Sequence, residues 1–229
     1  MAPMAEPQHD PAVSGIGWSF VVPVKELSVA KSRLPYPQPV RAALALAMAQ
    51  DVVATLRATP GVRRVVLITD DPDADAAFAD AAVVVADEPR AGLSAALRHG
   101  ALVAAARWPL DGVAALASDV PAATPQALAR VLAAIADLPA PRHPSRIVVA
   151  DSAGLGTVLL AAEPGRALDP RFEGGSRAAH LRTGAIDLTD HAAAGLRRDV
   201  DTQADLVAAA TLGLGPATRR ALSEHGLHP

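Results

Sequence analysis

Short apolar runs alternate with longer amphipathic stretches over roughly the first 140 residues, a pattern typical of strands and helices in turn. Each apolar run is too short for a helix, which predicts strands that are buried on both faces. The expected strands are residues 20–24, 64–69, 82–86 and 112–117. The expected helices are residues 40–57, 93–107 and 124–136, with another that begins in the acidic, proline-containing run 70–73. This alternation predicts an α/β fold with a mostly parallel, doubly wound sheet and right-handed crossovers.

The pattern changes beyond about residue 140, where strands are shorter, loops are longer and helices are fewer. The strands expected there are residues 146–150, 156–162 and 185–188, and the helices are residues 176–182 and 202–212. We interpret this part as a substrate-binding portion of the same domain.

Composition limits the architecture to one substantial α/β domain. The chain has 229 residues, of which 51% are hydrophobic and 20% charged, enough for one packed core. Residues 1–17 mix proline and glycine with polar residues, and we expect a disordered N-terminal tail. The domain is then residues 18–229.

Charge and residue usage exclude several classes of protein. The net charge is −3, so no global basic field attracts nucleic acid or an anionic membrane, and aromatic residues (3%) are too sparse for base stacking. The chain has no cysteine, which excludes disulfides, thiolate metal sites and a cysteine nucleophile. No apolar run approaches the ~20 residues of a membrane span, and residues 1–17 lack the pattern of a secretory signal. We expect a cytoplasmic protein without a nucleic-acid or membrane partner.

A basic loop follows the first expected strand. Lys25, Lys31 and Arg33 lie within nine residues of one another, with Ser28 and Ser32 between them. Ligands of α/β sheets bind at the carboxyl ends of strands, and clustered cations with open backbone N–H groups suit a polyphosphate. The alternative is a solvated basic loop before the first helix.

Acidic residues recur at other expected strand ends. Asp119 follows the apolar run 112–117, and Asp199 and Asp201 lie on one side of the chain if that segment is extended. Each could instead cap a turn or a helix. Two such carboxylate sites, together with triphosphate oxygens, suit Mg²⁺, which prefers oxygen ligands shared between protein and phosphate.

A third group of residues surrounds a glycine pair. Gly174, Gly175 and Ser176 lead into an expected helix, whose N–H groups suit an anion, and Arg177 adds positive charge. The alternative is a glycine turn with a serine cap. The sequence contains neither the dinucleotide-binding glycine fingerprint nor a Walker A motif, so P-loop chemistry is not expected.

Together these residues resemble the guanylyltransferases of coenzyme F-420 biosynthesis, which act on phosphoenolpyruvate or 2-phospho-L-lactate. The resemblance covers about residues 20–221. It depends on five ordered blocks, which are Val24-Lys25 to Leu34, Asp119-Val120-Pro121, Gly156-Thr157, Pro170-Arg171-Phe172 with Ser176 and His180, and Leu196-Arg197 to Leu206.

The resemblance implies a single-domain nucleotidyltransferase fold of the glycosyltransferase-A-like, Rossmann-like type. The implied reaction is attack by a substrate phosphate on the α-phosphorus of GTP, which releases pyrophosphate. The alanine- and arginine-rich composition suggests an actinobacterial source, and on that ground we expect phosphoenolpyruvate as the acceptor. The alternatives are 2-phospho-L-lactate and 3-phosphoglycerate. A further partner implied by the pathway is its next enzyme.

The resemblance also implies roles for individual residues. Mg²⁺ would be bound by Asp119 and Asp199, with Asp201 adjoining, and the GTP phosphates by Lys25, Lys31 and Arg33. The phosphoenolpyruvate-type substrate would be held by Thr157, by residue 173 and by Ser176, with possible anion contacts at Gly174, Gly175 and Arg177. Glu173 departs from the family, which often has glycine there, and its carboxylate must point away from an anionic substrate.

Two other classes of function compete with this interpretation. Molybdopterin- and sugar-phosphate nucleotidyltransferases usually have a glycine-rich loop directly after the first strand, whereas residues 24–34 contain no glycine. A non-enzymatic nucleotide-binding module would bind GTP without metal-dependent release of pyrophosphate, and the retained acidic residues argue against it.

Overall fold

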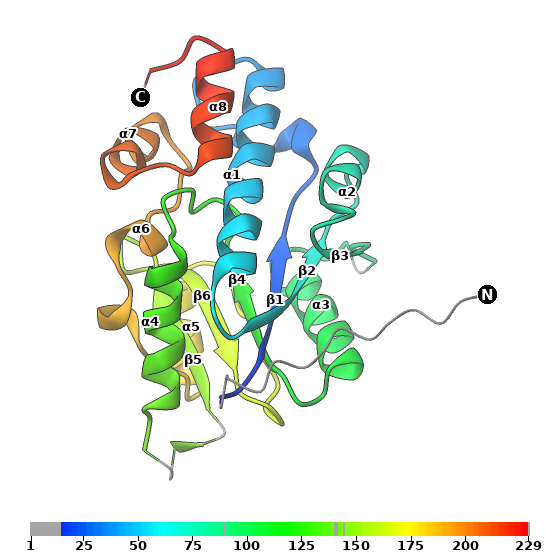
Figure 1. Ribbon diagram of the computed structural model, residues 1–229, viewed down its shortest axis with the longest axis vertical. Helices are drawn as coiled ribbons and strands as arrows, with labels where there is room; N and C mark the ends of the chain where they lie inside the picture. The colour runs from blue at the N-terminus through cyan, green and yellow to red at the C-terminus, as the bar shows by residue number, and fades with distance from the viewer. Residues whose placement is uncertain (1–14, 89, 140–141, 144, 229) are drawn as a thin grey trace, which may run out of the picture.

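One sheet organises the molecule, and seven of the described strands form it in the order β3-β2-β1-β4-β6-β5-β7 (Figure 1). The computed structural model describes residues 15–88, 90–139, 142–143 and 145–228. The strands are β1 (Trp18–Pro23), β2 (Val62–Ile68), β3 (Val83–Val85), β4 (Gly112–Leu116), β5 (Arg146–Ala150), β6 (Thr157–Ala162) and β7 (Ile186–Asp187). The predicted tail, residues 1–17, lies mostly outside the described residues. The division into this tail and a domain of residues 18–229 therefore stays a prediction.

Most strands of the sheet are parallel. β1 pairs in parallel with β2 and β4, and β3 extends the parallel part beyond β2. β6 runs antiparallel to its neighbours β4 and β5, and β7 pairs in parallel with β5. The predicted α/β fold with a mostly parallel sheet flanked by helices is confirmed.

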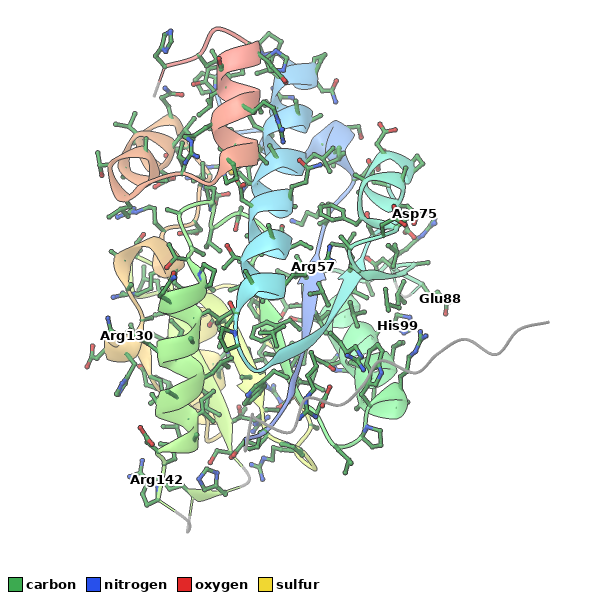
Figure 2. All side chains as sticks on the ribbon, in the orientation of Figure 1. Arg57, Asp75, Glu88, His99, Arg130 and Arg142 are labelled. Atoms are coloured by element: carbon green, nitrogen blue, oxygen red, sulfur yellow. The ribbon has the colours of Figure 1, made fainter. Side chains whose placement is uncertain are left out.

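Helices cover both faces of the sheet (Figure 1), with α1 and α4 on one face and α3 on the other. Phe20 and Val22 of β1 point into the core beneath α1 and α4, whereas Val21 points into the core beneath α3. This alternation is what a strand buried on both faces requires. Charged side chains such as Arg57 and Arg130 are exposed on the helices (Figure 2). The helices are α1 (Gln38–Ala58), α2 (Pro72–Phe78), α3 (Leu93–Arg107), α4 (Pro125–Ala136), α5 (Ser176–Arg182), α6 (Ala194–Arg197), α7 (Gln203–Leu212) and α8 (Pro216–Glu224), with 3₁₀ turns η1 (Leu27–Val29) and η3 (Thr189–His191).

The expected strands and helices agree with the observed ones to within two residues at each boundary. The sequence analysis did not predict α6, α8 or the two 3₁₀ turns. α6 has only four residues, too few for a helical period to be visible. α8 is short and depends on a contact with a distant part of the chain, described below.

The expectation that no apolar run approaches the length of a membrane span was wrong for α1. This helix has 21 residues and contains an 18-residue stretch with a mean hydropathy of 1.3, long and apolar enough to cross a membrane by length and composition alone. Half of that stretch is buried inside the molecule, and residues such as Val52 and Leu56 belong to the core over the sheet. α1 is a core helix of this fold.

A buried carboxylate joins α1 to α8. Asp51 of α1 accepts hydrogen bonds from the N–H groups of Ala217 and Thr218, both at 2.8 Å, in the first turn of α8. The N-cap residue of α8 is Gly215, which has no side chain for capping, and a Cβ there would lie 2.2 Å from the Asp51 carboxyl carbon. The carboxylate therefore acts as a remote cap, satisfying two N–H groups and facing the positive end of the helix dipole.

We predict that Asp51→Ala lowers the free energy of unfolding by about 1–3 kcal/mol, because it leaves two buried N–H groups without an acceptor. Urea denaturation measures the change. Asp51→Asn keeps one acceptor oxygen and should lose less. Asp80→Ala, at an exposed acid, is the control. A midpoint of Asp51→Ala equal to that of the control would contradict the capping role.

Candidate active site

The carboxyl ends of β1 and β4 meet at one edge of the sheet, because these neighbouring strands are parallel. The basic loop that carries Lys25, Lys31 and Arg33 leaves β1 at this edge. Asp119 follows β4 at the same edge. The expectation that strand ends bring the basic loop and Asp119 together therefore agrees with the geometry.

The reversed strand β6 brings a further group of residues to this edge. Because β6 is antiparallel to β4, its first residue, Thr157, lies beside the carboxyl end of β4. The N–H of Ala117 donates to the carbonyl of Val158 at 2.9 Å, which joins the end of β4 to the start of β6. Asp151, which follows β5, lies at the same edge and accepts from the N–H groups of Leu155 (3.0 Å) and Gly156 (2.8 Å).

The segment before α7 also returns to this edge. The N–H of Val200 donates to the carbonyl of Asp119 at 2.9 Å, so Asp199 and Asp201 flank a backbone contact with the β4 loop. Thr202 is the N-cap of α7, and it forms a capping box with Asp205. Because Thr202 does the capping, the alternative role of Asp201 as a helix cap is not the one seen.

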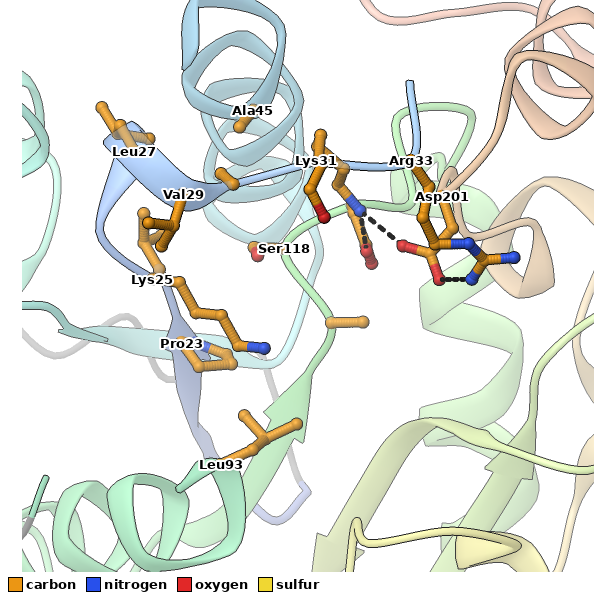
Figure 3. A pocket seen from close by; sticks show the side chains of 15 residues that line it. Pro23, Lys25, Leu27, Val29, Lys31, Arg33, Ala45, Leu93, Ser118 and Asp201 are labelled. Atoms are coloured by element: carbon orange, nitrogen blue, oxygen red, sulfur yellow. Dashed lines mark hydrogen bonds and ion pairs between the residues drawn. The ribbon is translucent and has the colours of Figure 1, made fainter. Parts of the chain in front are cut away.

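Lys31 bridges two of these carboxylates. Its ammonium donates to Asp119 and, at 3.1 Å, to Asp201, whose other oxygen accepts from Arg33 at 3.3 Å (Figure 3). Burial disfavours the charge on Lys31, but Asp119 and Asp201 outweigh this effect and raise its pKa. A positive group is thus stabilised between Asp119 and Asp201.

The basic loop and the β4 loop enclose a first cavity of about 300 Å³ (Figure 3). Lys25 lines this cavity but is exposed, and its side chain extends past Pro23. The polar residues that line the cavity include Lys25, Lys31, Ser32, Arg33, Asp119 and Asp201. Three cations and two carboxylates around one cavity suit a ligand that carries both phosphate and a metal ion.

A second cavity, of about 290 Å³, adjoins the first. Both cavities are lined by Asp119 and Asp201, together with Pro23, Leu93 and Ala117. The second is also lined by Asp151, Thr157, Phe172, Ser176 and Asp199. The two cavities therefore share a wall, and that wall carries two carboxylates.

The predicted residues around the glycine pair divide into two groups. Ser176 is buried, and its hydroxyl donates to Thr157 Oγ1 at 3.1 Å beside the second cavity. Gly174 and Gly175 have φ angles of 30° and 63°, which turn the chain into α5, but neither lines the cavity. Arg177 pairs with Asp187 at 2.6 Å and donates to the Gly154 carbonyl, so its position is that of a structural cation.

Glu173 lies away from both cavities. Its side chain is exposed, and a hydrogen bond from the Ser94 side chain is the main cause that lowers the pKa of its carboxyl. The hydroxyl of Ser94, in the first turn of α3, accepts in turn from the N–H of Phe172 at 2.8 Å. The carboxylate at position 173 therefore points toward α3, as an anionic substrate in the second cavity would require.

The carboxylates at the shared wall fit a hard divalent cation. Burial, followed by repulsion from Asp119, raises the pKa of Asp199 to about 6. Asp151 and Asp201 add to the repulsion. Among the described residues, no three His, Cys, Asp or Glu side chains are gathered closely enough to hold a metal by themselves. This arrangement suits Mg²⁺, which binds through one or two carboxylates and completes its shell with phosphate and water.

Two residues at the site were not identified from the sequence. Asp151 directly follows an expected strand, so the strand-end argument applied to Asp119 could have found it. His180 was noted only as part of a resemblance. It is 1% exposed and contacts Thr157, a long-range contact that no local pattern indicates.

Comparisons with known proteins give one family. A family model described as MobA-like NTP transferase domain matches residues 40–209. The phosphoenolpyruvate guanylyltransferase of Streptomyces coelicolor is 48% identical over 204 residues, covering 88% of this chain and 93% of that protein. Those of Salinispora arenicola (49% identical, 88% and 91% covered) and Thermomonospora curvata (46% identical, 93% and 90% covered) are similar to the same extent.

Solved structures share the fold at much lower identity. A protein of Desulfovibrio desulfuricans described as a candidate nucleotide-diphospho-sugar transferase superposes with a TM-score of 0.64 at 17% identity, covering 91% of this chain and 95% of that one. A nucleotidyl transferase of Methanothermobacter superposes with a TM-score of 0.56 at 18% identity, covering 85% and 96%. These likenesses support a nucleotidyltransferase-like fold.

We predict that Asp199→Asn raises the thermal midpoint of the metal-free protein at about pH 8, because the substitution removes a half-buried charge that faces Asp119, Asp151 and Asp201. A raised pKa in the folded protein means that protonation stabilises it. The wild type therefore loses stability as pH rises through about 6, and the gain from Asp199→Asn should shrink below that pH. Differential scanning fluorimetry in a chelator tests this. A lower midpoint for Asp199→Asn at about pH 8 would contradict the repulsion.

Proposed function

The chain belongs to the MobA-like NTP transferase family and, within it, to the phosphoenolpyruvate guanylyltransferases, and we propose that it transfers GMP from GTP to phosphoenolpyruvate. The products would be enolpyruvyl-diphospho-guanosine and pyrophosphate. Membership confirms the resemblance drawn from the sequence blocks, and it makes the protein a nucleotidyltransferase.

The observation that carries the proposal is the pair of cavities with a shared carboxylate wall. Nucleotidyl transfer needs a triphosphate and an acceptor phosphate to meet at the α-phosphorus. The first cavity has the cations for a triphosphate, and the second has the hydroxyl groups of Thr157 and Ser176 for a smaller anion. Asp119 and Asp201 border both cavities, so we place the reacting phosphorus beside them.

Lys25, Lys31 and Arg33 act in this proposal on the GTP phosphates. Their charges bind the β- and γ-phosphates and stabilise the pyrophosphate that leaves. Lys31 would exchange its contacts with Asp119 and Asp201 for phosphate oxygens when the nucleotide binds.

Nucleotidyl transfer generally uses a divalent cation, and we propose Mg²⁺ bound through Asp119 and Asp199, with Asp201 adjoining. When bound, it screens the repulsion between the two phosphates and supplies Lewis acidity at the α-phosphate. The fit rests on the oxygen-only donor set, on the position of the Lys31 ammonium between Asp119 and Asp201, and on the raised pKa of Asp199.

The acceptor needs positioning more than activation. A phosphate monoester is already an anionic nucleophile, so the proposal requires no strong general base. Thr157 and Ser176 would hold the acceptor so that its phosphate faces the shared wall. Glu173 would contribute through its backbone alone, since its side chain does not line the second cavity and the Ser94 hydroxyl lowers the pKa of its carboxyl.

Phosphoenolpyruvate is the acceptor that we propose, because the similar proteins carry it in their names. A place in coenzyme F-420 biosynthesis, a cytoplasmic location and transfer of the product to the next enzyme of that pathway follow from the same proposal. The competing acceptors are 2-phospho-L-lactate and 3-phosphoglycerate.

We predict that the protein releases pyrophosphate from GTP and Mg²⁺ when phosphoenolpyruvate is present, and that a chelator abolishes the release. Parallel reactions with 2-phospho-L-lactate and 3-phosphoglycerate identify the acceptor. The next pathway enzyme and its deazaflavin substrate should be present to trap a labile product. If a folded protein that binds GTP released no pyrophosphate with any of the three acceptors, the proposed reaction would be refuted.

We predict that Asp119→Ala and Asp199→Ala each lower turnover by about 100-fold or more, because each removes a carboxylate proposed to bind the metal ion. Steady-state pyrophosphate release measures the loss, and circular dichroism verifies the fold. The matched control is again Asp80→Ala, an exposed acid distant from both cavities. Near wild-type turnover in either site variant would exclude that residue from the metal site.

A further inference from the structure

His180 makes two hydrogen bonds that together determine which ring nitrogen carries its proton. The N–H of Arg171 donates to Nε2 at 2.9 Å, so Nε2 must be the unprotonated nitrogen. The other nitrogen, Nδ1, lies 3.0 Å from Thr157 Oγ1. In a neutral imidazole with Nε2 accepting, Nδ1 carries the proton and donates it to the Thr157 hydroxyl.

The surroundings of the ring keep it neutral. His180 is 1% exposed, and burial is the largest cause that lowers its pKa to about 4. Arg146 lowers the pKa further, Asp169 opposes it more strongly than Arg171 adds to it, and Glu173 also acts in the opposite direction. The donor at Nδ1 is therefore maintained throughout the neutral pH range.

The Thr157 hydroxyl accepts two hydrogen bonds and can still donate one. Its oxygen accepts from His180 Nδ1 and, at 3.1 Å, from the hydroxyl of Ser176. A hydroxyl has two acceptor lone pairs and one proton, so with both lone pairs engaged Thr157 keeps its proton for a third partner. Thr157 lines the second cavity, where an anionic oxygen is the natural acceptor for that proton.

The same ring also contacts the 171–172 loop, part of which lines this cavity. Phe172, which lines the cavity, packs edge-on against the His180 ring with the ring centres 5.1 Å apart. The preceding residue, Arg171, is the one whose N–H is bound by Nε2. One imidazole thus joins two parts of the cavity lining, β6 through Thr157 and the 171–172 loop.

We propose that His180 is a positioning residue for the acceptor substrate, whose Nδ1–H orients the Thr157 hydroxyl so that its proton binds an anionic oxygen of a phosphorylated carboxylic acid. The proposal rests on the proposed function, because that function places the acceptor in the second cavity. His180 does not touch the substrate and takes no part in proton transfer.

Two amide substitutions separate the two hydrogen bonds of His180. In His180→Asn the amide nitrogen can take the place of Nδ1, which keeps the donor to Thr157 and loses the acceptor for Arg171. In His180→Gln the amide oxygen can take the place of Nε2, which keeps the acceptor for Arg171 and loses the donor. We predict that His180→Gln raises KM for the acceptor about tenfold or more, the effect of one hydrogen bond to a charged group, while KM for GTP stays the same.

The matched variant and a double variant complete the test. His180→Asn should keep the acceptor KM within about threefold of wild type, below the effect of one such bond. Thr157→Val should raise the acceptor KM, and adding His180→Gln to it should cause little further change, since both remove the same interaction. Equal effects of Asn and Gln at position 180, or an equal rise in KM for GTP, would overturn the proposal in favour of a purely structural ring.

A spectroscopic measurement keeps this proposal separate from the proposed reaction. Long-range ¹H–¹⁵N correlations of the histidine rings, assigned by the resonances missing in His180→Gln, should show Nδ1 protonated and Nε2 unprotonated at neutral pH. The opposite tautomer would overturn the positioning role even in an active enzyme. Wild-type inactivity with every acceptor would instead refute the proposed reaction, and the tautomer would still decide the role of His180.

Discussion

The direction of one strand determines where the two halves of the site can meet. β6 is antiparallel to β4, and this reversal places Thr157 beside Asp119. If β6 were parallel to β4, its six residues would carry Thr157 to the opposite edge of the sheet, about 20 Å away at the rise of an extended strand. The parallel half contributes the basic loop and the first carboxylate, and the reversed strand contributes Thr157 to the second cavity. The candidate chemistry depends on both.

Charge concentrates where these halves join. Burial raises the pKa of Asp199 to about 6, and repulsion from Asp119, Asp151 and Asp201 adds to this effect. Cations at the same edge offset part of this repulsion, since Lys31 pairs with Asp119 and Asp201 and Arg33 pairs with Asp201. Structural acids elsewhere avoid such conflict. Asp51, for example, is buried but faces the N–H groups of α8.

The sequence predicted the sheet and most helices because buried strands and amphipathic helices have different periods, which are visible locally. Strand ends then identified Lys31, Asp119 and Asp201, which the structure brings together. The partnership of Asp51 with α8 could not be predicted, since its two halves are more than 160 residues apart and neither has a local pattern. The same holds for His180 and Thr157, which lie 23 residues apart and meet only through the packing of α5 on the sheet. Arg177 was predicted to add charge for an anion, and only the tertiary structure could show that Asp187 neutralises it.

The bridge made by Lys31 has a thermodynamic consequence. In the metal-free protein this ammonium is the counterion of Asp119 and Asp201, so a divalent ion must displace it to bind there. Displacement is unfavourable alone, but it would release a cation toward the first cavity, where we propose that the triphosphate binds. The metal ion and the nucleotide would both need the Lys31 ammonium to leave Asp119 and Asp201, so the ligand that binds first meets this cost and the second does not. By linkage, each ligand would increase the affinity of the other by the same factor. In the proposed reaction, a single side chain would thereby make the binding of the two ligands cooperative.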